Sequence, residues 1–353
     1  MVELLHLGFN QDNECFACGT STGFRVFNCD PFHEQFRREF NNGGIGIVEM
    51  LFRCNILAVV GGGTNPKFPP TKVMIWDDDQ GRCIAELSFR SQVRGVRLRK
   101  DRIVVAQEQK ISVYNFADLK LLHSIETVAN PHGLMALSSH PDSTVLACPG
   151  LHTGKVRIEL FDRVQTKFIS AHDSQIARMV LSLDGKILAT ASEKGTLIRV
   201  WNAADGTRLQ ELRRGSDQAL IHSIALSKGC EWLAVSSDKG TVHIFSLNED
   251  LRQASEDSMR RSNGVGGDLV SRNTTSMFSM VKGIVPLPSY LTSEWSFAQF
   301  KLPEENYVNV GFGPQGNTIL IATFGGSFYK VSFDPVKGGP CVQESYCAFF
   351  NAD

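Results

Sequence analysis

The strongest constraint on the fold of this 353-residue chain is a unit that recurs along most of its length. Each copy has an apolar strand, a glycine-bearing turn and a second apolar strand that ends in an aromatic residue. Asp or Asn usually follows the aromatic residue. The aromatic ends are Phe27, Trp76, Tyr114, Phe161, Trp201, Phe245 and Phe333, and the successive gaps are 49, 38, 47, 40, 44 and 88 residues.

The first five gaps are close to the ~40–45 residues of a four-stranded propeller blade. The last gap is two such lengths, so a repeat-sized insertion follows Phe245. The sequence therefore predicts an all-β fold: a single WD40-like, seven-bladed β-propeller over residues 1–353, with four antiparallel strands per blade and a long insertion in blade six. The repeats are degenerate, since Trp76-Asp77 is the only literal Trp-Asp pair among these ends.

Turn signals place the strands of the fifth blade, because Asp184-Gly185 and Asp205-Gly206 are typical hairpin turns. Blade one is predicted to begin at 4–9 and end at 35–40, and blade seven is predicted to end at 341–349. Every blade then takes its strands consecutively, so none is left over to join the first blade to the last. The fifth-blade strands are predicted at 177–182, 186–192, 197–202 and 207–213.

The composition excludes several classes of protein. With 42% apolar residues, 21% charged residues and a net charge of -1, the chain is an ordinary globular one with no bulk attraction to nucleic acid. Nine cysteines scattered through apolar runs indicate reduced core thiols of a cytosolic protein, and Cys15-Phe-Ala-Cys18 indicates a strand rather than a zinc site. From the sequence we expect no signal peptide, membrane-spanning run or catalytic motif. We expect no enzyme activity, metal or cofactor.

Two adjacent arginines, Arg213 and Arg214, join two similar repeats. In a strand, successive side chains point to opposite faces, so Arg213 should face the repeat before it and Arg214 the repeat after it. Each repeat carries two hydroxyl residues around a glycine turn, then a basic residue, with no paired carboxylate expected. The pattern predicts two anion sites side by side, with the sets Ser192, Thr196 and Arg199, and Ser237, Thr241 and His243.

A structural interpretation competes for part of this set. Many propellers hold each blade with a buried hydrogen-bond set of His, Ser, Asp and Trp, and His172, Ser192 and Trp201 could form one here. Buried arginines are uncommon unless they are paired, so this alternative explains Arg199 and the arginine pair poorly.

The insertion at 248–294 has two parts of different character. Residues 248–276 are polar and lack the apolar periodicity that would offset the entropy of ordering, so we expect disorder there. Residues 277–291 are apolar, and they are predicted either to pack on the propeller edge or to enter a membrane interface. The residues expected to insert are Met277, Phe278, Met280, Val281, Ile284, Val285 and Leu287.

The first predicted strand ends in a polar turn that contains Asn10 and Asp12. Asn and Asp favour β-turns for backbone reasons, which supplies a purely structural interpretation. The alternative is a loop that contacts a partner protein.

These motifs together resemble the PROPPIN family, seven-bladed propellers that bind polyphosphoinositides and include the WIPI proteins of autophagy. The resemblance covers the whole chain, and Asn10-Gln-Asp12, Val60-Gly-Gly-Gly63 and Val73-Met-Ile-Trp-Asp-Asp78 are most similar to the third and fourth human WIPI paralogues. Leu212 stands where the family's double-arginine motif usually has Phe. The resemblance implies a first phosphoinositide site at His172, Ser192, Thr196, Arg199 and Arg213, and a second at Arg214, Ser237, Thr241 and His243.

The resemblance also implies a function. The family headgroups are phosphatidylinositol 3-phosphate and phosphatidylinositol 3,5-bisphosphate, and the family's blade-six loop corresponds to 277–291. By the same resemblance, Asn10 and Asp12 would bind the large lipid-transfer protein of autophagy. We therefore expect a monomeric phosphoinositide effector, peripherally bound to preautophagosomal and endosomal membranes from the cytoplasm. The alternative is a protein scaffold that binds no lipid.

Overall fold

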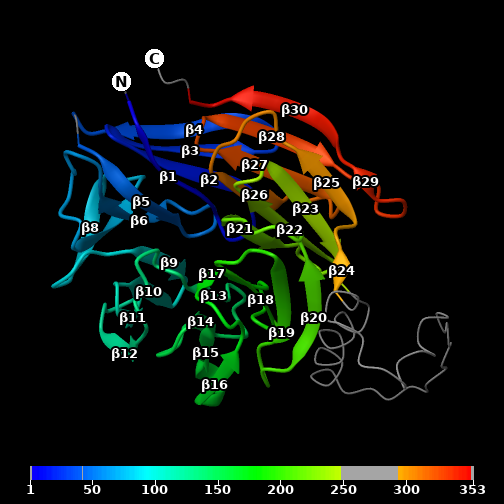
Figure 1. Cartoon of the computed structure of the whole chain (residues 1–353). Helices are drawn as coiled ribbons and strands as arrows, with labels where there is room; N and C mark the ends of the chain where they lie inside the picture. The colour runs from blue at the N-terminus through cyan, green and yellow to red at the C-terminus, as the bar shows by residue number, and fades with distance from the viewer. Residues whose placement is uncertain (1, 42, 248–292, 351–353) are drawn as a thin grey trace, which may run out of the picture.

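The computed structural model describes residues 2–41, 43–247 and 293–350, which form seven antiparallel sheets around a common axis (Figure 1). The prediction of a seven-bladed, all-β propeller is confirmed. Within the described ranges the one helical element is a single turn of 3-10 helix, Phe161–Arg163.

The first four blades each take four consecutive strands. Blade one has β1 (Leu4–Phe9), β2 (Cys15–Thr20), β3 (Gly23–Cys29) and β4 (Phe32–Glu39). Blade two has β5 (Ile45–Met50), β6 (Ile56–Gly61), β7 (Lys72–Asp77) and β8 (Arg82–Ser88). Blade three has β9 (Gly95–Arg99), β10 (Arg102–Ala106), β11 (Lys110–Asn115) and β12 (Leu121–Glu126). Blade four has β13 (Ala136–Leu137), β14 (Val145–Pro149), β15 (Lys155–Leu160) and β16 (Gln165–Ser170).

The last three blades follow the same plan, with additions at the outer edge of two of them. Blade five has β17 (Ile176–Leu181), β18 (Ile187–Ser192), β19 (Leu197–Asn202) and β20 (Arg208–Arg213), to which β24 (Glu294–Trp295) is added. Blade six has β21 (Ile221–Leu226), β22 (Trp232–Ser237), β23 (Thr241–Ser246) and β25 (Ala298–Lys301), to which β29 (Gly339–Pro340) is added. Blade seven has β26 (Val308–Phe312), β27 (Thr318–Thr323), β28 (Ser327–Ser332) and β30 (Val342–Ala348).

Burial along the strands follows their place in the blade. The second strands are covered by blades on both sides, so β2, β18 and β27 are buried at every residue. The outermost strand β4 instead alternates between half-buried and exposed residues, as a strand with one solvated face should. Alternating burial therefore marks the outermost strand of a blade, whereas continuous burial marks a strand that lies between neighbouring blades.

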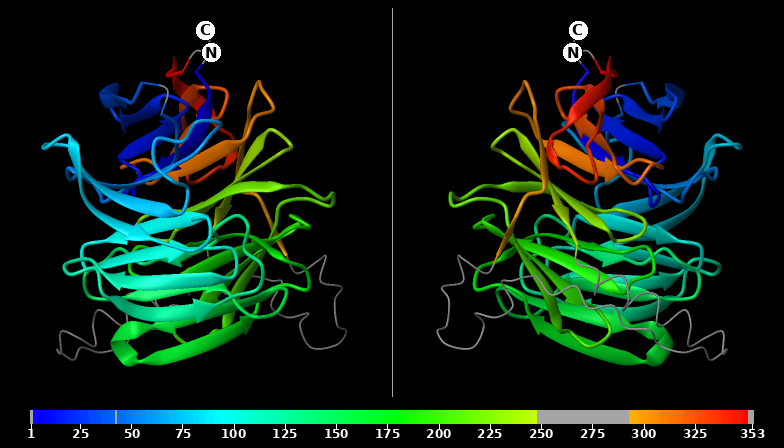
Figure 2. Two further views of the ribbon diagram at one scale, coloured as in Figure 1. Left: turned by 90° about the vertical axis from the view of Figure 1, so that its left-hand side faces the viewer. Right: turned by 90° about the vertical axis from the view of Figure 1, so that its right-hand side faces the viewer.

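Apolar clusters fill every junction between neighbouring blades, which makes the ring continuous. The junction of blade seven with blade one is rich in phenylalanine: the ring centroid of Phe16 lies 4.9 Å from that of Phe27 and 5.5 Å from that of Phe328. The amide of Asn309 also donates to the Leu7 carbonyl at 2.5 Å. No strand is shared across this junction, as the strand count predicts. Figure 2 shows the first and last blades side by side, with the two ends of the chain close together.

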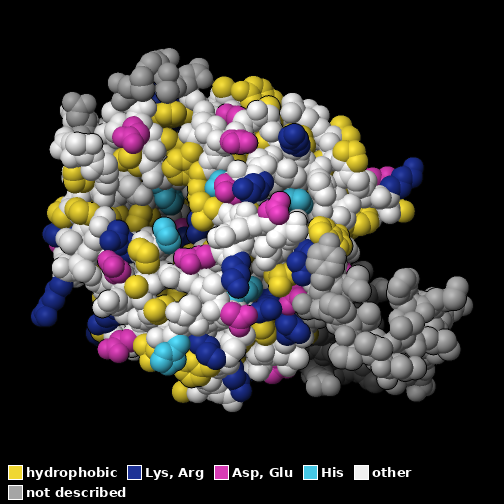
Figure 3. Space-filling view, viewed as in Figure 1, with side chains coloured by type: hydrophobic (Ala, Val, Ile, Leu, Met, Phe, Trp, Pro, Cys, Tyr) yellow, Lys and Arg dark blue, Asp and Glu magenta, His cyan; other side chains and the backbone are white. Residues whose placement is uncertain are grey.

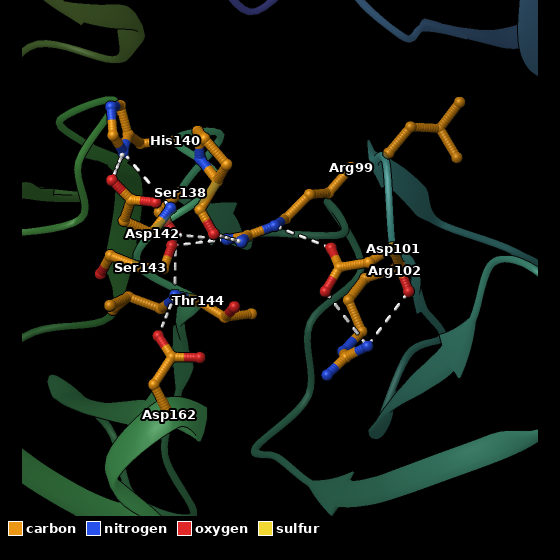
Figure 4. Close-up of polar contacts among 12 residues, drawn as sticks. Arg99, Asp101, Arg102, Ser138, His140, Asp142, Ser143, Thr144 and Asp162 are labelled. Carbon is orange, nitrogen blue, oxygen red and sulfur yellow. Dashed lines mark hydrogen bonds and ion pairs between the residues drawn. The ribbon is translucent and has the colours of Figure 1, made fainter.

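A buried arginine fastens blade three to blade four (Figure 4). Arg99, at the end of β9, is 4% exposed and pairs with Asp101 at 2.8 Å. Its guanidinium also donates to the main-chain carbonyls of Pro141 and Ser143 in the first connection of blade four. One side chain therefore satisfies acceptors on two blades while keeping its charge paired.

The coarse strand predictions agree with the structure. The fifth-blade strands differ from the predicted ranges by one residue at four of their eight ends and match at the other four. Cys15 and Cys18 both lie buried in β2, and burial raises the pKa of the Cys18 thiol to about 12. The fourth strand of blade six follows the insertion, so the insertion lies between the third and fourth strands of that blade.

A central channel of about 740 Å³ follows the ring axis. The first strands of the blades line it along their length. A hollow is visible near the middle of the face shown in Figure 3, with histidine side chains at its margin.

Candidate functional site

The arginine pair lies where blade five passes into blade six. Arg213 is the last residue of β20, and Arg214 begins the connection to β21. Both are mostly buried, at 9% and 7% exposed. The Arg213 Nη2 donates to Ser293 Oγ at 3.4 Å, whereas the Arg214 Nε donates to the Gly195 carbonyl at 2.7 Å.

Arg214 is held by blade five but acts on blade six. Besides Gly195, its guanidinium donates to the main-chain carbonyl of Asp217 in the connection between the blades. Its charge helps to lower the pKa of His243 in blade six, and Asp238 of that blade supports the Arg214 charge. The two arginines thus bond to different partners, but Arg214 donates to blade five and to the connection, so its hydrogen bonds do not follow the predicted direction towards blade six.

The first predicted set gathers at one end of blade five. Ser192 ends β18 and is buried, Thr196 is half-buried directly before β19, and Arg199 lies within β19. The turn between Ser192 and Thr196 needs Gly195, whose φ is +62° and whose missing Cβ would collide with the Ala219 carbonyl. The tight turn therefore brings the two hydroxyl residues together.

One expectation about this set is wrong: it does contain a paired carboxylate. Arg199 and Glu211 lie directly opposite each other on β19 and β20, and the Arg199 Nε is 2.8 Å from Glu211 Oε2. Glu211 also lies 3.2 Å from Arg208 and accepts from Ser293 Oγ at 3.2 Å. Burial alone would raise the pKa of this carboxyl, but its hydrogen bond and charge interaction with Arg199 hold the pKa below the usual value.

His172 belongs to a buried hydrogen-bond set inside blade five. Its Nε2 lies 3.0 Å from Thr190 Oγ1, and the Trp201 indole donates to the same oxygen at 3.0 Å. The hydroxyl in this set is Thr190, not Ser192 as the structural interpretation expected. Burial, aided by the charge of Arg199, lowers the pKa of His172 to about 4, so the imidazole is neutral near pH 7.

The second predicted set repeats this layout in blade six. Ser237 ends β22, Thr241 begins β23 and His243 follows it, with Gly240 at φ +65° in the turn. The His243 Nδ1 lies 3.3 Å from Ser296 Oγ, and burial followed by the charge of Arg214 lowers its pKa to about 4. Two equivalent hydroxyl and nitrogen-donor sets therefore stand on neighbouring blades, with the arginine pair between them.

The chain after the insertion contributes residues that the sequence analysis missed. β24 pairs in parallel with the end of β20, so that Trp295 stands opposite Arg213 and Glu294 opposite Leu212. Ser293 bridges Arg213 and Glu211, and Trp295 is 52% exposed. This pairing could not have been found from the sequence, because strands paired across an insertion leave no local sequence signal.

The Asn10 turn is built into the propeller rather than exposed. Asn10 is 5% exposed: its side-chain oxygen accepts from the Cys15 N–H at 3.1 Å, and its amide donates to the Phe52 carbonyl at 3.3 Å. Asp12 is half-buried and accepts from the Glu14 N–H at 3.2 Å. Asn10 therefore bonds within the propeller, as the β-turn interpretation expects, and Asp12 is among the residues that line the central channel.

The predicted membrane-contact residues, 277–291, and the polar segment 248–276 lie outside the described residues. Among the residues that the structure describes, no helix is long and apolar enough to cross a membrane. In the same ranges, no cluster of three or more His, Cys, Asp or Glu residues could hold a metal ion.

The protein is a seven-bladed β-propeller that carries a doubled set of polar donors beside an arginine pair. The family model described as PROPPIN matches residues 3–347, so the chain belongs to the PROPPIN family. These are autophagy-related β-propellers that bind phosphoinositide membranes and act as binding proteins.

Relatives across eukaryotes support the assignment. The chain is 42% identical over 353 residues to autophagy-related protein 18e of Arabidopsis thaliana, covering 99% of this chain and 89% of that protein. It is 32% identical to autophagy-related protein 18 of Dictyostelium discoideum, covering 95% and 91%.

Solved structures show the same fold. Kluyveromyces lactis Hsv2 with a complete loop 6CD superposes with a TM-score of 0.78 at 22% identity, covering 99% of this chain and 100% of that one. KlAtg21, solved as a complex with the coiled coil of AgAtg16, superposes with a TM-score of 0.77 at 25% identity and the same coverage.

Proposed function

We propose that this protein binds phosphatidylinositol 3-phosphate and phosphatidylinositol 3,5-bisphosphate at the two sets of residues that flank Arg213 and Arg214. The observation that carries the proposal is the duplication of Ser, Thr and a nitrogen-donor residue on blades five and six. A phosphorylated headgroup carries about -1.5 to -2 charge per phosphate. Charge-assisted hydrogen bonds to such a group contribute roughly 1.5–3 kcal/mol each.

Burial determines which groups meet the headgroup first. Thr196 and Thr241 are half-buried and the Arg199 side chain is 20% exposed, so these are the accessible donors. Arg213 and Arg214 are more deeply buried, so in this proposal they contribute mainly a positive electrostatic potential. Each site alone is therefore shallow, and two sites on one rim gain from effective concentration on a single membrane.

The apolar segment 277–291 adds a third contact in this proposal. The insertion that contains it follows β23 and returns through β24 beside Arg213, so its second end joins the propeller next to the first proposed site. We infer that Met277, Phe278, Met280, Val281, Ile284, Val285 and Leu287 enter the interface while the headgroups bind the rim. The protein would then act on preautophagosomal and endosomal membranes, where it would recruit the large lipid-transfer protein of autophagy through Asp12.

Liposome flotation tests the rim sites. Arg213→Ala or Arg214→Ala alone should weaken flotation on vesicles that contain phosphatidylinositol 3-phosphate. Arg213→Thr with Arg214→Thr should abolish it while the circular dichroism spectrum stays unchanged. The matched control is Arg82→Thr with Arg90→Thr, which removes the same charge from exposed positions of blade two. Flotation of the rim variant at the wild-type level would favour the scaffold alternative.

A second comparison separates headgroup binding from insertion. Phe278→Asp with Ile284→Asp should release the protein from liposomes and leave its affinity for soluble, short-chain phosphoinositide near normal. Loss of both activities in this variant would mean that the segment supports the fold of the sites and does not enter the bilayer.

A further inference from the structure

A polar cluster unrelated to the rim sites lies on the wall of the central channel. Arg178 and His222 belong to the first strands of blades five and six, β17 and β21, and Tyr307 directly precedes β26, the first strand of blade seven. All three line the channel. The His222 and Tyr307 rings are in contact, with centroids 4.6 Å apart.

Strand irregularities fix the orientation of the Arg178 guanidinium. The register of β17 shifts between Ile176 and Arg178, and that of β21 between Ile221 and Ser223, so the carbonyls of Ala177 and His222 are free to accept. The Arg178 Nη1 donates to Ala177 O at 2.6 Å and the Nε to His222 O at 2.7 Å. The Nη2 donates to the Tyr307 hydroxyl at 2.9 Å, and that hydroxyl donates to His222 O at 2.9 Å.

The charge of Arg178 is not matched by an acid. In residues 2–41, 43–247 and 293–350, no carboxylate forms an ion pair with Arg178, whereas Arg97 and Arg94 of the same channel pair with Glu49 at 2.9 Å and Glu108 at 3.3 Å. A guanidinium has five N–H donors, and the three acceptors above use one on each nitrogen. One hydrogen on each terminal nitrogen is left for a ligand.

His222 supplies a second, independent indication of a ligand. It is 6% exposed, and its Nδ1 is buried with no hydrogen-bond partner among the described residues. Buried polar atoms normally have a partner, because an unpaired one keeps the full cost of leaving water. Burial lowers the pKa of His222, so the ring is neutral and can donate one N–H.

We propose that Arg178, His222 and Tyr307 bind an oxyanion, the phosphate or carboxylate group of a small molecule, inside the central channel. The channel volume of about 740 Å³ lies within the roughly 300–1,000 Å³ typical of small-molecule sites. The preorganised guanidinium and the unpaired imidazole nitrogen would both contact the anion. The site shares no residue with the rim sets on blades five and six, so a soluble anion could occupy it while the protein is on a membrane.

The test uses the full chain with Arg213→Thr and Arg214→Thr, which removes the rim arginines. Isothermal titration calorimetry with inorganic phosphate, inositol hexakisphosphate and citrate should show one binding event for at least one probe, and the order of affinities distinguishes phosphate from carboxylate. Adding His222→Phe preserves ring packing and the main-chain acceptor for Arg178, and it should weaken binding at least tenfold. Arg178→Lys keeps the positive charge but loses the planar set of guanidinium N–H donors, so it should also weaken binding.

Three results would overturn the proposal. The first is that none of the probes binds at millimolar concentration. The second is that adding His222→Phe to the rim variant leaves its affinity unchanged. The third is that Arg178→Lys does not change the affinity of a folded protein. Liposome flotation of the single His222→Phe variant should equal that of wild type. Failure of the channel site therefore leaves the rim proposal intact, and flotation of the rim variant at the wild-type level would leave the channel site intact.

Discussion

Arg199 and Glu211 face each other across β19 and β20, with the guanidinium Nε 2.8 Å from the carboxylate. In the proposed first rim site, this carboxylate would compete with an incoming phosphate for Arg199. A headgroup bound there would have to displace Glu211 or share Arg199 with it.

Removing that competitor should strengthen lipid binding. We expect Glu211→Gln to raise affinity for phosphatidylinositol 3-phosphate vesicles about three- to tenfold, or roughly 0.7–1.4 kcal/mol, because one repulsive charge is lost from a partly exposed site. Quantitative flotation against lipid concentration measures this. The control is Glu126→Gln on β12, which changes the net charge by the same amount at a position far from the site. Affinity equal to or below that of the control would show that Glu211 orients Arg199 for the ligand.

Two buried histidines should make the folded state sensitive to acid. His172 and His243 have pKa values lowered to about 4 in the folded protein, below the unfolded value of 6.5. Between these values the unfolded chain binds protons that the folded chain does not, so stability falls as pH drops from 6.5 to 4 and this contribution is flat below 4. The loss is on the order of 2–3 kcal/mol per histidine.

Urea unfolding at pH 7.5, 6 and 4.5, without lipid, measures this loss. Signals assigned to the His172 and His243 imidazoles that titrate near 6.5 in the folded protein would contradict the prediction.

The blade-three clamp should contribute strongly to stability. Arg99→Met leaves the carbonyls of Pro141 and Ser143 without their donor and Asp101 without its 2.8 Å partner. Leaving these carbonyls without a hydrogen bond costs about 1–3 kcal/mol, and the ion pair with the half-exposed Asp101 adds little. The free energy of unfolding should fall by that amount, whereas Arg82→Met, an exposed arginine bonded only to Gln80, should change it little. A similar small loss in both variants would show that the contact between the blades is carried by apolar packing.

Asp12 offers the cleaner test of partner recruitment. Asn10→Ala removes two buried hydrogen bonds, so it should lower stability by roughly 1–2 kcal/mol and confuse any binding assay. Asp12→Ala should abolish capture of the autophagy lipid-transfer protein in a pull-down while the melting temperature and liposome flotation stay unchanged. Asp142→Ala, on an exposed loop of blade four, is the charge-matched control. Capture by Asp12→Ala at the control level would leave the turn with a structural role alone.

The fold could be predicted because its signals are local. Period-two burial and glycine turns define each hairpin, and Gly185 and Gly206 place the fifth-blade strands within about a residue. The number of blades followed from the spacing of the aromatic residues at the ends of the third strands. The two hydroxyl sets followed in the same way, because each is a short segment around one turn.

The errors concern contacts that depend on register or on distant segments. Thr190 and Ser192 lie on the same face of β18, so alternation alone could not decide which hydroxyl meets Trp201. The pairing of Arg199 with Glu211 requires the register of β19 against β20, which contains a bulge. The contact of Ser293 with Arg213 spans 80 residues and has no local signal at all.

In the described ranges the first and last blades share no strand, so each blade takes its four main strands from one stretch of chain. In six of the blades only short connections separate these strands. Blade six is different: its third strand ends at Ser246 and its fourth begins at Ala298, so 51 residues must leave the ribosome between them. Until then the edge of β23 is unpaired, and such an edge invites incorrect pairing. The length of the insertion therefore sets a delay in biosynthesis, and shortening it should speed the productive folding of the blade that holds the second rim site.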